Sequence, residues 1–326
     1  MKLKTKIILL ILLVLVLVGT LCAIIFLRAT TDNEEPRRIN LCEGTTYEAL
    51  CDSLQASSTF RLMAQTFGLD EHVRPGSYLV EPHMSELSLV RKLRNGQQDP
   101  IRLTIGKFRT PQQLNEYLNS KLMHNDFDIS LDSFYLIRPN TYEFYWTVTP
   151  EKFMERMVDE YNCFWTKNIG IDGELRCDLI ELSDFSDTRL ETIIIASIVE
   201  EETNNNQEKP LIASVYLNRL VKGIPLQADP TVKYAVGDFT LKRILNKHLA
   251  TDSPFNTYLH TGLPPAPICL PSEASVDAVL NAPQTQYLYF CASDKLDGTH
   301  RFATTLAEHN RNAAAFHKAL NTRGIK

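Results

Sequence analysis

The chain has 326 residues, of which 44% are hydrophobic and 22% are charged. These proportions exclude a wholly disordered protein, and the length is sufficient for two hydrophobic cores. The formal net charge is −5, and no stripe of basic and aromatic residues stands out, so we expect no nucleic-acid partner.

The N-terminal residues predict a membrane anchor followed by a linker. Residues 1–6 contain three lysines, and residues 7–27 contain no charged residue. A helix of that length spans the hydrocarbon layer of a bilayer, and the positive-inside rule places residues 1–6 in the cytoplasm. A cleaved signal peptide is the alternative, but the apolar run is long and no convincing cleavage site precedes Arg28. Residues 28–38 are polar, and we interpret them as a linker.

The seven cysteines leave the question of disulfides open. Cys22 lies in the predicted anchor, and the other six are Cys42, Cys51, Cys163, Cys177, Cys269 and Cys291. Six cysteines allow 15 pairings, and the short separations single out the pairs 42/51 and 163/177 for testing. The alternative is that most of them are small buried residues. No C-x-x-C motif occurs, so we expect no zinc ribbon and no metal centre.

Residues 39–105 predict a small α+β module. The pattern predicts helices over 46–56 and 58–69, a strand over 78–80, a helix ending near Gly96, and a strand over 101–105. Residues 106–187 predict a connecting α+β region. It contains a helix that begins at Pro111 after the N-cap Thr110, the aromatic strand "TYEFYW", and a helix over 150–165. Alternating aromatics of this kind more often lie in a core than against a sugar.

Residues 188–326 contain most of the residues that suggest chemistry. The segment 189–203 predicts a helix that is apolar on every side, and 207–223 predicts a second helix that Gly223 ends. A long stretch with the composition of a loop follows, and then a strand in "QYLYFCA". An irregular segment of such length inside a compact domain usually serves a function.

The apolar helix ends in three consecutive carboxylates, Glu200, Glu201 and Glu202. Successive helical residues point about 100° apart, so these three side chains cannot form one site. Each could be a solvated helix end or a buried proton donor, because burial raises the pKa of a carboxyl. The motifs of serine hydrolases, nucleotide-binding loops and zinc proteases are absent, and carboxylate chemistry remains.

Five segments in a fixed order resemble the YceG-like family of membrane-anchored endolytic murein transglycosylases. They are "ASIVEEET", "IASVYLNRL", "LQADPTVKYA", "DSPFNTYLHTGLPPAPI" and "YLYFCASDKLDGTHRFATTLAEHN". The resemblance is tight over residues 191–310. It implies an α+β fold with an N-terminal transmembrane helix (7–27), a LysM-like subdomain (39–105), a connecting region (106–187) and a catalytic domain (188–326). It also implies a bacterial inner-membrane location with the catalytic domain in the periplasm.

The resemblance also implies the site residues. It assigns the catalytic role to Glu200 and substrate binding to Glu202, Gln227, Asp229, Asn256, Tyr258 and His300. It implies no cofactor. The sequence departs from the family pattern at Ala228, Phe255, Ala266 and Ser272.

The family's reaction needs one carboxyl group. It cleaves the bond between N-acetylmuramic acid and N-acetylglucosamine in nascent peptidoglycan strands, and the muramic acid 6-hydroxyl closes a 1,6-anhydro ring. We expect Glu200 to act first as acid and then as base, with a pKa raised by its apolar helix. The resemblance implies peptidoglycan strands as substrate and, by analogy, cell-wall synthases as partners. A non-catalytic peptidoglycan-binding scaffold and a two-carboxylate glycoside hydrolase remain alternatives.

Overall fold

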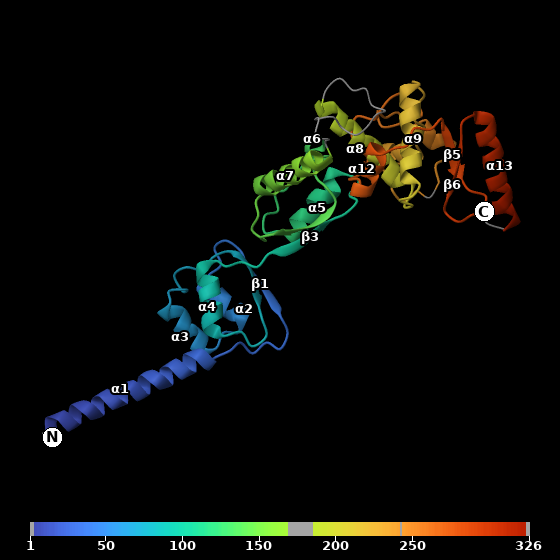
Figure 1. Ribbon diagram of the computed structural model, residues 1–326. Coiled ribbons are helices and arrows are strands. Elements are labelled where there is room, and N and C mark those ends of the chain that lie inside the picture. The colour runs from blue at the N-terminus through green and yellow to red at the C-terminus, as the bar shows by residue number, and fades with distance from the viewer. Residues whose placement is uncertain (1–2, 169–184, 242, 324–326) are drawn as a thin grey trace. The chain divides into compact units, whose positions relative to one another are not determined.

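The structure is a computed structural model that describes residues 3–168, 185–241 and 243–323 (Figure 1). The chain forms two compact units. The first comprises residues 1–103, 121–125 and 142–149, and the second comprises residues 104–120, 126–141 and 150–326. The division into LysM-like, connecting and catalytic domains remains a prediction.

The N-terminal helix α1 spans Leu3–Arg28. The prediction that it crosses a membrane is wrong. In the described part of the chain, no helix has both the length and the apolar character that crossing a bilayer demands. This finding corrects both the predicted transmembrane helix and the predicted single-pass inner-membrane location.

The first unit combines a two-stranded sheet with short helices. Its elements are β1 (Arg37–Leu41), α2 (Tyr47–Leu54), α3 (Ser58–Thr66), β2 (Gly76–Val80) and α4 (Glu86–Asn95). The strands β1 and β2 are antiparallel, with Ile39 opposite Tyr78. Both side chains are buried in a core that the helices complete with Leu50, Phe60 and Leu93. The helices and β2 confirm the sequence-based prediction, but β1 was missed and shortens the predicted linker.

Two further strands and three helices occupy the middle of the sequence. The strands β3 (Ile101–Ile105) and β4 (Asn140–Phe144) pair with each other. The helices are α5 (Pro111–Lys121), α6 (Leu131–Phe134) and α7 (Pro150–Asn168). Thr110 accepts a hydrogen bond from the backbone N–H of Gln113, as its predicted capping role requires. Tyr142 and Phe144 are buried, which confirms the core interpretation for these two aromatics.

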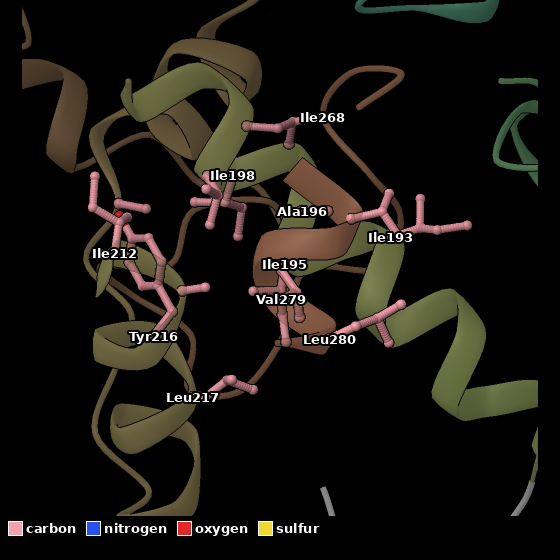
Figure 2. Close-up of a cluster of buried hydrophobic side chains, with 14 of the residues drawn as sticks. Ile193, Ile195, Ala196, Ile198, Ile212, Tyr216, Leu217, Ile268, Val279 and Leu280 are labelled. Carbon is pink, nitrogen blue, oxygen red and sulfur yellow. The ribbon is translucent and has the colours of Figure 1, made fainter. Parts of the chain in front are cut away.

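Three helices build the core that supports the functional site. They are α8 (Phe185–Glu202), α9 (Lys209–Val221) and α12 (Glu273–Leu280). Figure 2 shows Ile195 of α8, Tyr216 of α9 and Val279 of α12 among the side chains that converge between these helices. Because α8 packs against neighbours on several sides, an apolar residue at nearly every position is buried, and its amphipathic pattern is weak.

The segment that we expected to be an irregular loop contains helices. They are α10 (Asp229–Val236), α11 (Asn246–Leu249) and α12. The antiparallel strands β5 (Tyr289–Ala292) and β6 (His300–Ala303) follow, and α13 (Leu306–Thr322) packs against them (Figure 1).

Five cysteines form no disulfide with one another in the part of the chain that the structure describes. Cys42 is exposed and Cys51 is buried, so the candidate pair 42/51 does not form a disulfide. Cys163, Cys269 and Cys291 also have no disulfide partner among the described residues. Cys177 lies outside the described residues, and the pair 163/177 remains a prediction.

Candidate functional site

The three glutamates at the end of α8 point to three different environments, as the helical geometry predicts. Glu200 faces α9 and α12 and contacts Lys209 and Ser275. Glu201 faces two basic residues, Lys107 and Arg109. Glu202 contacts Tyr216 on α9 and lines a cavity. The chemistry open to each carboxyl therefore differs.

Glu200 is held as a carboxylate. Its Oε2 accepts hydrogen bonds from Lys209 Nζ at 3.0 Å, from Ser272 Oγ at 2.5 Å and from Ser275 Oγ at 2.5 Å. Burial alone raises the pKa of Glu200, but the hydrogen bonds from the two serines and Lys209 outweigh it, so the net pKa is lowered. The expectation of a raised pKa at Glu200 is therefore wrong.

Glu201 is not a solvated helix end, which was one of the two possibilities that the sequence left open for it. Only 10% of its side chain is exposed, and its two oxygens lie 3.3 Å from Lys107 Nζ and 3.0 Å from Arg109 Nη2. The Arg109 guanidinium also stacks on the ring of Phe239. The pair of cations fixes Glu201 in a structural ion-pair cluster.

Glu202 has the raised carboxyl pKa that was expected at Glu200. Burial raises the pKa of Glu202 to about 7, and the negative charges of Asp229 and Glu201 add to this effect. The hydroxyl of Tyr216 donates a hydrogen bond to Glu202 Oε1 at 2.5 Å, which opposes the shift without cancelling it. Near neutral pH an appreciable fraction of Glu202 is therefore protonated.

Glu202 opens onto a cavity of about 300 Å³, a size that lies within the usual range of small-molecule sites. Gln227, Asp229 and Tyr258, three residues that the resemblance implied, also line this cavity. The Tyr258 hydroxyl donates a hydrogen bond to Asp229 Oδ1 at 2.7 Å, and burial raises the pKa of Tyr258. Gln227 adopts a left-handed conformation with φ of 50°, and its backbone N–H is bound to the carbonyl of Thr257. The segments "LQADPTVKYA" and "DSPFNTYLHTGLPPAPI" therefore meet at one wall of this cavity.

The cavity is also lined by two residues that the sequence did not lead us to assign, Arg219 and His309. Arg219 is 7% exposed, and its guanidinium donates hydrogen bonds to the carbonyls of Leu226 and Leu288. The imidazole of His309 stacks on Tyr289 with ring centroids 5.5 Å apart. Burial, together with the charge of Arg219, lowers the pKa of His309. Arg219 lies in "YLNRL" and His309 lies in "LAEHN". Only the fold shows that both residues line the same cavity as Glu202.

Two implied binding residues do not line the cavity. Asn256 is fully buried, and its amide donates to the carbonyls of Leu249 and Thr251 and accepts from the N–H of Tyr258. His300 lies on β6, where Glu208 Oε1 accepts its backbone N–H and Glu208 Oε2 contacts Nδ1, both at 2.9 Å. In this structure both side chains are therefore engaged by hydrogen-bond partners within the fold. Among the residues that the structure describes, no cluster of three or more metal-ligating side chains occurs.

Comparison with known proteins identifies relatives of this fold. Residues 39–315 match the sequence profile of the YceG-like family. The chain is 47% identical over 119 residues to the endolytic murein transglycosylase of Bacillus subtilis, which covers 36% of this chain and 32% of that protein. It is 32% identical over 165 residues to the endolytic murein transglycosylase of Streptococcus pneumoniae. This alignment covers 49% of this chain and 29% of that protein.

A solved structure also resembles this one. The crystal structure of a YceG-like protein from Listeria monocytogenes matches it with a TM-score of 0.50 and 25% sequence identity, covering 86% of this chain and 99% of that one. The alignments with the two curated relatives, by contrast, span less than a third of each relative.

Proposed function

The chain belongs to the YceG-like family, and on this premise we propose that it is an endolytic murein transglycosylase. It cleaves the β-1,4 bond between N-acetylmuramic acid and N-acetylglucosamine inside peptidoglycan strands and leaves 1,6-anhydro ends. The support comes from the relatives that carry this name and from a cavity that contains a carboxyl group suited to proton transfer. Cell-wall synthases are the partner class that we propose with this activity.

We assign the acid and base role to Glu202 instead of Glu200. The single observation that carries this choice is that Glu202 combines a pKa of about 7 with a position on the cavity wall. A group with a pKa near the operating pH can both donate and recover a proton. Glu200, by contrast, uses its Oε2 to accept hydrogen bonds from Lys209 and two serines, and its pKa is lowered.

The reaction then proceeds with balanced proton transfers. Protonated Glu202 gives its proton to the glycosidic oxygen while the bond from that oxygen to C1 of the muramic acid breaks. The 6-hydroxyl of the same sugar attacks C1, and the Glu202 carboxylate takes the hydroxyl proton. No water enters the products, so one carboxyl suffices. Gln227, Asp229 and Tyr258 line the cavity and are positioned to hydrogen-bond sugar hydroxyls or N-acetyl groups.

The decisive experiment measures the chemical form of the cut ends. The protein and its Glu202→Gln and Glu200→Gln variants are incubated with uncrosslinked peptidoglycan strands, and the products are weighed by mass spectrometry. We expect anhydro ends from the wild type and a loss of about 10²-fold or more in rate for Glu202→Gln. Glu200→Gln should retain more activity per folded molecule, where the folded fraction is measured by circular dichroism.

Two outcomes would contradict the proposal. Reducing ends in place of anhydro ends would indicate a hydrolase, for which Asp229 is the second carboxyl on the same cavity. A full loss of activity in folded Glu200→Gln, with activity retained in Glu202→Gln, would return the catalytic role to Glu200.

A further inference from the structure

His309 lines the Glu202 cavity but has no part in the proton transfers assigned to Glu202. It lies in the first turn of α13, which packs against β5 and β6. Its backbone N–H donates a hydrogen bond to the carbonyl of Thr305 at 3.0 Å. The Thr305 hydroxyl in turn accepts a hydrogen bond from the N–H of Glu308 at 3.2 Å and so caps the helix. The backbone that carries His309 is therefore fixed at the edge of the cavity.

The imidazole ring belongs to a stack of side chains from three elements. The ring centroids of His309 and Tyr289 lie 5.5 Å apart, and the two planes are inclined by 31°. The Arg219 guanidinium lies 5.1 Å from the centroid of the same Tyr289 ring. These contacts hold the imidazole in place before a ligand arrives, which reduces the entropy lost on binding.

The imidazole offers one nitrogen to a ligand. Nδ1 is buried, which leaves Nε2 as the ring nitrogen that can contact an occupant of the cavity. Burial and the charge of Arg219 lower the pKa of His309 from its ordinary value of 6.5, so the imidazole is neutral near neutral pH. In neutral imidazole, Nε2 either donates or accepts a hydrogen bond. A hydroxyl group does both, so a sugar hydroxyl can pair with Nε2 in either tautomer.

The size of the cavity brings an occupant close to His309. Its volume of about 300 Å³ lies at the lower end of the range of roughly 300–1,000 Å³ for ligand sites. A sugar whose glycosidic oxygen reaches Glu202 therefore also contacts the other walls, and His309 is part of them.

We propose that His309 binds the glycan strand in its neutral form, through a hydrogen bond between Nε2 and a sugar hydroxyl beside the bond that is cleaved. This role rests on the proposed transglycosylase function and adds a binding residue to it. A purely structural role, by contrast, would need only the packing of the ring on Tyr289.

The charges around the imidazole give the proposal a pH dependence. The titratable or charged side chains that share the cavity with it are Glu202, Tyr216, Arg219, Asp229, Tyr258 and Tyr289. On β6, His300 and Arg301 are paired with Glu208 and Asp294, and on α13 Glu308 accepts the N–H of Thr304.

Protonation of His309 adds a second positive charge beside Arg219. A bound strand excludes water from the cavity and so makes this charge more costly. The strand therefore binds the neutral form better, and kcat/KM should fall as the pH drops through the pKa of His309, below 6.5.

Three variants test the proposal, with kcat/KM for uncrosslinked peptidoglycan strands measured as a function of pH. His309→Phe keeps a ring against Tyr289 but loses the hydrogen bond, and kcat/KM at neutral pH should fall about fivefold or more. His309→Gln keeps hydrogen-bonding groups but cannot titrate, so it should retain more activity and lose the acidic limb. His317→Phe is the control, because His317 is an exposed residue of α13 that does not line the cavity, and its profile should match the wild type.

Two outcomes would overturn the proposal: an unchanged kcat/KM in His309→Phe, or an acidic limb that persists in both His309 variants. Thermal unfolding confirms that each variant is folded, and the limb in His309→Gln decides if His309→Phe is not. The proposed function itself fails differently, through the absence of anhydro ends from the wild type. In that case calorimetric titration with the same strands decides, since equal affinities of the wild type and the folded His309 variants overturn the binding role and weaker binding by the variants supports it.

Discussion

Lys209 Nζ lies 3.0 Å from Glu200 Oε2, and only 4% of the lysine side chain and 13% of the glutamate side chain are exposed. The pair connects the end of α8 with the start of α9, and Ser272 and Ser275 extend it to α12. An ion pair with so little exposure is sensitive to the loss of one partner, since the remaining charge stays desolvated.

Glu200→Gln should therefore lower the stability of the folded protein. The substitution leaves the Lys209 ammonium buried without a countercharge, and we expect a loss of about 3–5 kcal/mol in the free energy of unfolding. Urea denaturation followed by circular dichroism measures this loss. The double variant Glu200→Gln with Lys209→Met removes both charges and should recover part of it. A single variant as stable as the wild type would show that the pair contributes nothing to the fold.

Glu202 should make stability depend on pH in a predictable direction. Its pKa is about 7 in the folded protein, against an ordinary value of 4.5 for a solvated glutamate in the unfolded chain. Between these values the folded state binds more protons than the unfolded state, so stability falls as pH rises from about 4.5 to about 7. The total contribution is on the order of 3 kcal/mol.

The difference between wild type and Glu202→Gln isolates this effect, because every other titrating group is common to both proteins. We expect Glu202→Gln to gain stability relative to the wild type as pH rises through this window. Denaturant unfolding at four pH values between 4 and 8 measures the difference. A difference that is independent of pH would mean that Glu202 titrates normally.

Tyr216→Phe should shift the pH profile of strand cleavage. The Tyr216 hydroxyl donates a hydrogen bond to Glu202 and lowers its pKa, so its removal should raise that pKa above about 7. The alkaline limb of kcat/KM should move to higher pH. Tyr289→Phe is the control, since it removes a hydroxyl from the same cavity that is not the donor to Glu202. A shift of equal size in both variants would contradict this role for Tyr216.

The sequence predicts the supporting helices better than the site. The helix at α8 was predictable because Ile193 and its neighbours form a long apolar run, and Gly223 indicates where α9 ends. The same apolar run leaves the choice among Glu200, Glu201 and Glu202 open. With apolar residues on every side, periodicity cannot tell which of three consecutive carboxylates faces a cavity.

The missed elements have identifiable causes. The sequence Asp229-Pro230 indicates a turn, but Pro230 also suits the first turn of a helix, and α10 begins there. The signature of a capping box, Thr305 followed three residues later by Glu308, marks the start of α13, where the sequence analysis predicted no helix. The contribution of Arg219 and His309 to the Glu202 cavity could not be predicted, because these residues are distant in sequence and only the fold brings them together.

Asn256 and Tyr258 offer a contrast between a structural residue and a cavity residue. Asn256→Ala removes three hydrogen bonds from a fully buried site, and we expect a loss of about 3 kcal/mol in the free energy of unfolding. Per folded molecule, its KM for peptidoglycan strands should change little, because the side chain does not line the cavity.

Tyr258→Phe should show the opposite pattern. It removes a hydroxyl that bonds to Asp229 on the cavity wall, so stability should fall by no more than about 1.5 kcal/mol while KM rises. Unfolding curves and initial rates measured on the same preparations separate the two effects. A raised KM in folded Asn256→Ala would mean that Asn256 contacts the strand after all. An unchanged KM in Tyr258→Phe would mean that the strand does not reach the wall formed by Tyr258 and Asp229.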